Sequence, residues 1–470
     1  MTGERKRVLG LVSCLLLTAV PQTRAFETGL ASDQDRGQVV PPSATPSPPA
    51  TPVTPAAAAA SATVADAPAT TGSQAQTAIT SASGLRWFDP TKLPFIPVPL
   101  IAVDPNSGTT LGVLPTWIHT NDQQQITRII APDLLYNPYF GIGAHFRLFS
   151  YPSEEEHWSV VTQVQQYVER AIDFEYEAGR LRNDLWTFHG SLIVDRDGTP
   201  RFYGVGNNSP QYDDTDYTQQ RELAESQLGL NLSHAWQLLY TARAQRIDVR
   251  PGTLARLVSL QTRFGDILGI GTNDQILNRL SLVYDTRDNV TLPTQGVKWV
   301  AYGGLASRRG LFNDSMYSET GVDGRGFWRL TPDTILATHM ALRYLLSTNR
   351  VPFWALSSIG GGDSVIGGSQ PLRGYGEGRF YDRDSFSTTL ELRRRVASFD
   401  AVATHVEIEV TPFVDLGRVF ARNSTFPLEQ LHQVYGIGFR GIARPSVVGY
   451  VDIGYGSNGV AAFTGIAYPF

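Results

Sequence analysis

From Leu85 to Phe470 the chain is a series of short runs in which apolar and polar residues alternate. In the clearest run, residues 171–178, the apolar side chains of Ile172, Phe174 and Tyr176 recur at every second position, and acidic residues lie between them. Successive side chains of a β-strand point to opposite faces, so this period of two predicts a strand with one apolar and one acidic face. Three carboxylates on one face suit a water-filled barrel, although this run alone does not separate a barrel from a soluble sheet.

Similar runs, bounded by turn residues, predict about sixteen strands. They are expected at residues 107–118, 139–150, 157–168, 171–181, 184–196, 220–233, 236–249, 276–286, 296–306, 316–329, 333–346, 383–397, 405–419, 432–442, 446–456 and 460–470. The segment 126–136 is a further candidate, which we assign to a loop because single-chain bacterial barrels have an even number of strands. Tight connections such as 182–183 alternate with long ones such as 197–219 and 250–275, as periplasmic turns alternate with external loops.

The end of the chain carries a pattern typical of membrane barrels. One face of the last predicted strand is almost entirely apolar and includes Ala462, Ile466, Tyr468 and Phe470. Its final residues, Ile466, Tyr468 and Phe470, resemble the C-terminal signal by which outer-membrane barrels are recognised for insertion. A closed barrel is the β-structure that satisfies every backbone group in lipid. The sequence therefore predicts an all-β fold, a transmembrane antiparallel β-barrel of about sixteen strands over residues 85–470.

Two segments precede the predicted barrel. Residues 1–25 resemble a secretory signal peptide, because a basic start is followed by a short apolar run and a small-residue cleavage site. Residues 26–84 are rich in Pro, Ala, Ser and Thr, and this composition predicts a disordered periplasmic segment. No later stretch has the roughly 18 to 20 consecutive apolar residues that a spanning helix needs.

Composition narrows the classes of function. The net charge of −5 and the pI near 5.9 indicate no nucleic-acid partner. The one cysteine, Cys14, lies in the predicted signal peptide, so we expect neither disulfides nor thiolate metal sites in the mature chain. A Gly-x-Ser-x-Gly elbow is absent from the sequence. We expect no enzymatic activity, no metal and no cofactor.

The most distinctive motifs lie in the last third of the chain. In order, they are a glycine run at 360–362, the Arg-Gly-aromatic turn of Arg373, Gly374 and Tyr375, a strand containing Glu391, a second strand containing Asp415, and the aromatic terminus Phe470. Together they resemble the C-terminal half of the BamA/TamA superfamily, the bacterial surface antigens. The resemblance covers roughly residues 95–470 and implies a location in the bacterial cell outer membrane.

The resemblance also implies a contact between a loop and the barrel wall. In the family, a long external loop inserts into the lumen, and the arginine of its Arg-Gly-aromatic turn meets acidic residues of the inner wall. The matching positions are Arg373, Glu391 and Asp415, and both carboxylates are flanked by apolar residues of the opposite parity. A guanidinium suits this role because it binds carboxylates through parallel hydrogen bonds. The loop either braces a plugged barrel or gates it, since both roles need the same contacts.

The function implied by the resemblance is the insertion, assembly or translocation of proteins at the outer membrane. It would use a lateral seam between the first strand, near 109–118, and the last, at 460–470. Expected partners are outer-membrane lipid, nascent outer-membrane proteins, and the barrel assembly machinery for the chain's own insertion. The POTRA modules that precede the barrel in the family are not recognisable here. An alternative therefore stays open: a plugged channel or surface barrel without assembly activity.

Overall fold

The computed structural model describes residues 96–121, 126–153, 155–179, 181–290, 292–310, 313–346, 351–361, 372–401, 404–421, 428–443 and 447–466. These residues belong to one compact unit. The predicted signal peptide, the segment 26–84, Tyr468 and Phe470 lie outside the described residues. Within the described ranges, no helix is long and apolar enough to cross a membrane.

The described chain is almost entirely β-structure, which confirms the predicted all-β class. The main strands are β1 (Ile96–Asp104), β2 (Gly108–Thr120), β3 (Ile126–Ile130), β4 (Asp133–Asn137), β5 (Gly141–Ser150), β6 (Glu156–Gln165), β7 (Arg170–Ala178), β8 (Trp186–Asp197), β10 (Thr215–Asn231), β11 (Trp236–Pro251), β13 (Gly271–Asp285), β14 (Gly296–Arg309), β15 (Asn313–Thr331), β16 (Thr334–Leu345), β19 (Asp384–Ala401), β20 (Thr404–Phe420), β21 (His432–Ala443), β22 (Val447–Gly456) and β23 (Gly459–Ile466). The connections contain β9 (Arg201–Phe202), η2 (Gln211–Asp213), β12 (Val258–Ser259), α2 (Leu260–Arg263), η3 (Phe353–Ala355), β17 (Ser357–Ile359) and β18 (Phe380–Asp382).

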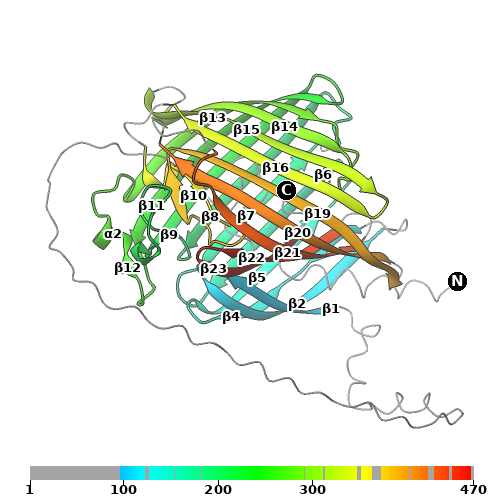
Figure 1. Cartoon of the computed structure of the whole chain (residues 1–470), viewed down its shortest axis with the longest axis horizontal. Helices are drawn as coiled ribbons and strands as arrows, with labels where there is room; N and C mark the ends of the chain where they lie inside the picture. The colour runs from blue at the N-terminus through cyan, green and yellow to red at the C-terminus, as the bar shows by residue number, and fades with distance from the viewer. Residues whose placement is uncertain are drawn as a thin grey trace, which may run out of the picture. The chain divides into compact units, whose positions relative to one another are not determined.

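Antiparallel ladders join the main strands in chain order into one large sheet (Figure 1). Its connections differ at the two ends. At one end, which we call the loop end, the long connections 198–214, 252–270 and 346–383 join successive strands. At the other, which we call the terminal end, the chain enters β1 and most connections are short, as between β15 and β16. The predicted alternation of short and long connections is present.

Two predictions about the start of the sheet are wrong. The segment 126–136, expected as a loop, forms β3 and β4, which pair with both β2 and β5. In addition, β1 precedes the predicted first strand at 107–118 and pairs with β2 along its whole length. Without β1, counting the segment 126–136 as a strand gives an odd total. The expectation of an even number of strands therefore assigned this segment to a loop. Pro97 and Pro99 hide β1 from a pattern search, since prolines within a run argue against a strand.

The two faces of the sheet have the opposite polarity to those of a water-soluble protein. The exposed face, which we call the outer face, is apolar and carries Leu111, Leu134, Ile142, Ile172, Leu192, Leu228, Leu280, Leu390, Tyr435 and Ile453. The buried face, which we call the inner face, is rich in charge and carries Asp133, Arg147, Asp195, Arg221, Arg279, Glu319, Asp323, Arg343, Glu391, Arg393, Asp415, Arg440 and Asp452. An apolar outside and a polar inside are typical of strands that cross a bilayer.

Tryptophans concentrate on the outer face near the terminal end. Trp186 and Trp236 begin β8 and β11, Trp299 lies near the start of β14, and all are substantially exposed. The Trp299 ring covers Gly324 of the neighbouring strand, where an added Cβ would lie 2.3 Å from it. Aromatic rings of this kind form the girdles of membrane barrels at the bilayer interface. The terminal end therefore carries one such interface.

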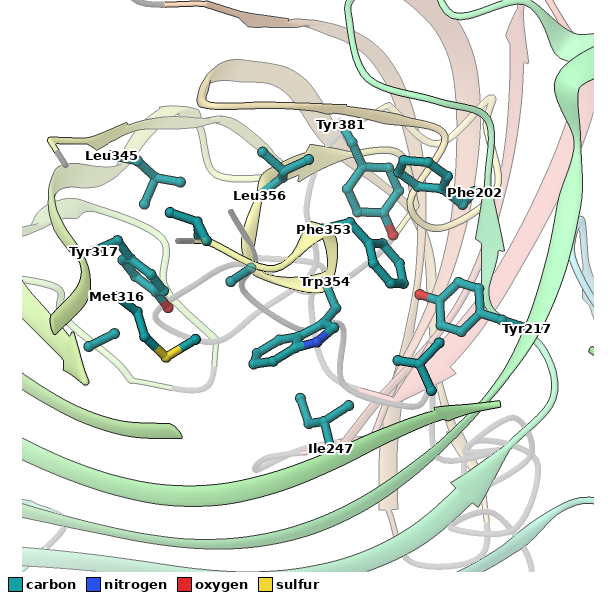
Figure 2. Close-up of a cluster of buried hydrophobic side chains, with 14 of the residues drawn as sticks. Phe202, Tyr217, Ile247, Met316, Tyr317, Leu345, Phe353, Trp354, Leu356 and Tyr381 are labelled. Carbon is teal, nitrogen blue, oxygen red and sulfur yellow. The ribbon is translucent and has the colours of Figure 1, made fainter. Parts of the chain in front are cut away.

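The loop end is closed on the inner face by an apolar cluster, which we call the cap core. The loop residues Phe202, Phe353 and Trp354 pack there against wall residues such as Tyr217 and Ile247. Figure 2 shows Phe353 and Trp354 among side chains from the wall strands, such as Tyr217 and Ile247, and from the connections, such as Phe202 and Tyr381. Ring centroids of Phe202 and Phe353 are 5.2 Å apart, in edge-to-face geometry. The cap core fixes the long connections to one another and to the wall.

We expect Trp354→Ala to weaken the cap core while leaving the strand ladders intact. Trp354 is 1% exposed, and truncating a buried aromatic residue costs about 3–5 kcal/mol. The urea midpoint of the protein refolded in detergent, followed by circular dichroism, should fall. Tyr212→Ala is the control, because Tyr212 on η2 is 78% exposed. Equal midpoints for the two variants would contradict the assignment of Trp354 to a supporting core.

Candidate functional site

The candidate site begins with a tight turn, Leu372 to Tyr375, in the connection between β17 and β18. The N–H of Tyr375 donates to the carbonyl of Leu372 at 3.1 Å. Asp415 on β20 holds this turn from the wall. Its Oδ2 accepts hydrogen bonds from the backbone N–H groups of Leu372 and Arg373, at 3.1 and 3.0 Å. One wall carboxylate therefore fixes the backbone of the turn as well as any side chain that reaches it.

The backbone of this turn needs particular residues. Leu372 has a φ of +75°, a region that non-glycine residues rarely adopt and that persists only where surrounding contacts impose it. Burial of its side chain and the bond to Asp415 supply those contacts. At Gly374, an added Cβ would lie 2.7 Å from the backbone nitrogen of Gly456 on β22. Glycine in the Arg-Gly-aromatic sequence thus lets the loop approach the wall backbone closely.

Arg373 reaches three strands of the wall. Its Nε and Nη2 donate to the two oxygens of Asp415 at 3.0 and 2.8 Å. Its Nη1 donates to Glu391 on β19 at 2.5 Å and to Asp452 on β22 at 2.7 Å. The guanidinium also stacks on the ring of Phe413, with Cζ 3.6 Å from the ring centroid. Every polar edge and one flat face of this side chain are therefore occupied.

Two more arginines complete the arrangement. Arg393 donates to Glu391 at 3.0 Å, and Arg440 on β21 contacts both Glu391 and Asp452. Three buried arginines thus face three buried carboxylates in what we call the ion cluster: Arg373, Arg393, Arg440, Glu391, Asp415 and Asp452. The three positive charges balance the three negative ones, and this balance stabilises the cluster because an unpaired buried charge is strongly destabilising.

The protonation state of Arg373 follows from its surroundings. Burial lowers the pKa of its guanidinium, but the carboxylates of Asp415, Asp452 and Glu391 outweigh burial and raise the pKa well above its usual value. The arginine therefore keeps its positive charge, and the cluster fastens the loop to the wall. With each carboxylate bound to arginine, the geometry is that of a clamp and not of a proton-transfer site.

Tyr375 extends the clamp to the last hairpin of the sheet. Its hydroxyl lies 2.9 Å from the Oγ of Ser457, in the β22–β23 turn, and accepts the N–H of Ser457 at 3.1 Å. Its ring packs edge-on against Phe380 and His432. The loop thus contacts three wall strands through Arg373, and it contacts β21 and the final turn through Tyr375.

A second buried ion group supports the loop from the other side. Glu319 on β15 accepts hydrogen bonds from Arg279 on β13 and from Arg343 on β16. Arg343 also donates to the carbonyl of Leu356, which follows η3 in the loop, at 3.3 Å. The loop is therefore attached to the wall on both sides.

The structure brings together five of the residues named from the sequence: Arg373, Gly374, Tyr375, Glu391 and Asp415. Of the predicted insertion signal, only Ile466, the last residue of β23, is described. Asp452, Arg393 and Arg440 were missed, although a signal existed. Asp452 is the one carboxylate of its strand and has apolar neighbours of the opposite parity, as Glu391 and Asp415 do. The family resemblance implies only two acidic partners, so Asp452 is not among the residues that it names.

No group of three His, Cys, Asp or Glu side chains in the described ranges is arranged to hold a metal ion.

Comparison with known proteins gives a family match. A family model described as the Omp85 superfamily domain matches residues 157–443, which is more than half of the chain and includes most of the ion cluster. No curated protein matches the chain.

A comparison with solved structures finds several that are similar to the chain at low sequence identity. BamA from Haemophilus ducreyi lacking POTRA domains 1–3 is 13% identical, with 75% of each chain covered and a TM-score of 0.48. CdiB from Escherichia coli is 11% identical, with 79% of this chain and 62% of that chain covered and a TM-score of 0.43. Wzi, a carbohydrate-binding β-barrel of Escherichia coli involved in capsule assembly, is 12% identical, with 80% and 83% covered and a TM-score of 0.36.

We expect Arg373→Ala to destabilise the folded protein by about 3–5 kcal/mol, because it leaves a buried carboxylate without a compensating charge. The urea midpoint, followed by heat-modifiable migration in gels, measures this loss. Arg246→Ala is the matched control, since Arg246 forms an ion pair with Asp274 on the exposed face of the sheet. The control should behave like the wild type. A wild-type midpoint for Arg373→Ala would show that the ion cluster does not stabilise the fold.

Proposed function

The chain belongs to the Omp85 superfamily of β-barrel proteins of the bacterial outer membrane, and on this premise we propose that it inserts or translocates proteins through a seam between β1 and β23. Membership of this family agrees with the predicted resemblance. The proposal concerns the role of this chain within the family and the site at which a client protein would engage it.

The observation that carries the proposal is the state of the two edges of the sheet. β1 and β23 come into contact (Figure 1), yet no ladder joins their described residues, whereas each pairs fully with its other neighbour. Backbone groups without partners are costly in lipid. Two strand edges in contact without a ladder therefore form a site where an extended chain could add by backbone pairing.

The clamp suits this role because it steadies one side of the seam. The ion cluster and Tyr375 attach the loop to β19, β20, β21, β22 and the β22–β23 turn. On the other side of the seam, the turn from β1 to β2 meets the loops through Asn106: its side chain donates to the carbonyl of Glu377, and its carbonyl accepts from Arg201.

Two partners follow from this proposal. Lipid would contact the apolar outer face and its tryptophans, and an unfolded outer-membrane protein would contact the seam. The chain's own insertion by the barrel assembly machinery remains a prediction from its terminal strand, whose last aromatic residues are not described.

Depletion of the protein tests the proposed function. We expect other outer-membrane β-barrel proteins to decrease severalfold in outer-membrane fractions, because their insertion would lack its site, while inner-membrane proteins stay unchanged. Quantitative mass spectrometry of separated membranes measures both, and a plasmid copy should restore the loss. Unchanged outer-membrane protein levels after complete depletion would contradict an assembly role.

A second function, a plugged channel, has one observation in its favour. The cap core and the loop that carries Arg373 fill the inner face at the loop end, as a plug would. Conductance in planar bilayers distinguishes the two. If the loop plugs a channel, deletion of residues 351–380 should raise the conductance strongly. In that case, depletion of this protein should leave the levels of other outer-membrane proteins unchanged.

A further inference from the structure

A row of charged side chains crosses the inner face of the sheet near the terminal end. Asp285 on β13, Lys298 on β14 and Arg325 on β15 lie directly opposite one another in the strand ladders. Side chains at such positions have Cβ atoms about 4.5–5.5 Å apart. Trp299 is exposed on the outer face, so its neighbour Lys298 points to the inner face. Arg325 also donates to Asp323, two residues earlier on its strand, at 3.3 Å.

Two arginines reach this row from connections at the terminal end. Arg287, in the connection between β13 and β14, donates to the two oxygens of Asp285 at 3.0 and 2.8 Å. Its Nη1 donates to the carbonyl of Val290 at 3.1 Å. Arg182, in the connection between β7 and β8, has its Nη2 3.8 Å from Oδ2 of Asp285. Both oxygens of this carboxylate are therefore already bound by Arg287.

Lys298 has no comparable partner. Within the described residues, it forms neither a hydrogen bond nor an ion pair. The charged groups around it are three arginines and one carboxylate, namely Arg182, Arg287, Arg325 and Asp285. Of these, Arg182 and Arg287 already share Asp285 with each other. Three cations, including Lys298, thus depend on one carboxylate, which leaves an excess of two positive charges among the described residues.

This excess distinguishes the row from the ion cluster, in which three arginines face three carboxylates. Like charges repel at these separations, and a charge that is partly removed from water is costly without a partner. The side chains of the row are half-buried and not sealed from solvent, since Arg182, Asp285, Arg287 and Lys298 all keep part of their surface exposed. A solute can therefore reach the row, and an anion would relieve the repulsion.

The backbone that carries Arg182 is held in place on purpose-built contacts. Arg182 has a φ of +59°, a region that non-glycine residues rarely adopt and that persists where surrounding contacts impose it. Glu155, in the connection between β5 and β6, supplies such contacts on both sides. It accepts the backbone N–H of Leu181 at 2.9 Å and a hydrogen bond from the side chain of Asn183. The turn thus directs Arg182 toward Asp285 on a strand that is not its neighbour.

We propose that Arg182, Lys298 and Arg325 bind a phosphate group on the inner face at the terminal end, in what we call the anion site. Ammonium and guanidinium groups are the side chains that bind phosphate in proteins. A phosphate monoester carries a charge of about −1.5 to −2 at neutral pH, which matches the excess of two positive charges. Asp285 keeps Arg287 in place, and the anion is the partner of Lys298.

The anion site goes beyond the proposed function and does not depend on it, because none of its residues belongs to β1 or β23. Free inorganic phosphate and a lipid that carries a phosphate monoester share the required chemistry. The experiments below distinguish these two sources.

The first test measures the urea midpoint of the full chain, refolded in nonionic detergent, in chloride and in millimolar inorganic phosphate at equal ionic strength. Phosphate should raise the wild-type midpoint, because a ligand of the folded state stabilises it. In Lys298→Met, phosphate should have no effect. In chloride, the midpoint of this variant should equal or exceed that of the wild type, because an uncompensated charge is removed; a lysine with a structural role would lower it.

Two further variants complete this test. Arg182→Gln changes a residue outside the strand ladders, so it should fold as the wild type does and should also lose the response to phosphate. Arg246→Ala is the control, because Arg246 is paired with Asp274 on the exposed face, and it should respond as the wild type does. An absent response in the wild type, or an equal response in the wild type and the two site variants, would overturn the inference.

The second test measures binding directly by isothermal titration calorimetry of the full chain. The dissociation constant for inorganic phosphate should rise about tenfold in Arg182→Gln and in Lys298→Met, because each loses a hydrogen bond to a charged group. Dodecyl phosphate in mixed micelles is the second probe. Tighter binding of dodecyl phosphate, lost in the same variants, identifies a lipid headgroup as the source, and equal or weaker binding identifies the soluble anion. Binding of neither probe, or binding that both substitutions leave intact, would overturn the anion site.

Discussion

Arg373 and Asp415 meet through side-chain and backbone hydrogen bonds together, and the position of the long loop depends on this contact. Asp415 fixes the turn at Leu372 and Arg373 while it also neutralises the guanidinium. Once the turn is fixed, Gly374 lies against β22 and Tyr375 reaches Ser457. One buried charge pair thus fixes the Arg373 turn against the wall and next to the last hairpin.

The two strands at the proposed seam, β23 and β1, differ in how they are held and in their sequence. The last hairpin is tied to the loop through Tyr375 and Ser457, whereas β1 contains prolines at positions 97 and 99. In lipid, backbone groups must find partners within protein. Within the described residues, the edges of β1 and β23 touch without a ladder, and the proposed function follows from this constraint.

Much of this architecture was predictable from the sequence, and the exceptions have physical reasons. Period-two alternation identified most strands because their outer face is apolar, and the order of the motifs identified the family. The alternating pattern does not reveal β1, because prolines interrupt it. The expectation of an even number of strands then assigned the residues of β3 and β4 to a loop. Strand parity placed Glu391 and Asp415 on the inner face of the sheet. It could not show that Asp452 also binds Arg373 or that Arg440 joins the same cluster, because that requires knowing how far each strand is shifted against the next. The signal peptide and the segment 26–84 stay predictions.

The most direct test of the account is charge reversal at its central contact, with Arg373→Glu and Asp415→Arg made singly and together and assayed by heat-modifiable migration in outer-membrane fractions. The account predicts that each single variant fails to fold, because it buries like charges against each other. The double variant should fold again in part, because the pair is restored while the N–H groups at 372 and 373 lose their acceptor. Wild-type folding of all three variants would contradict the claim that this contact positions the loop.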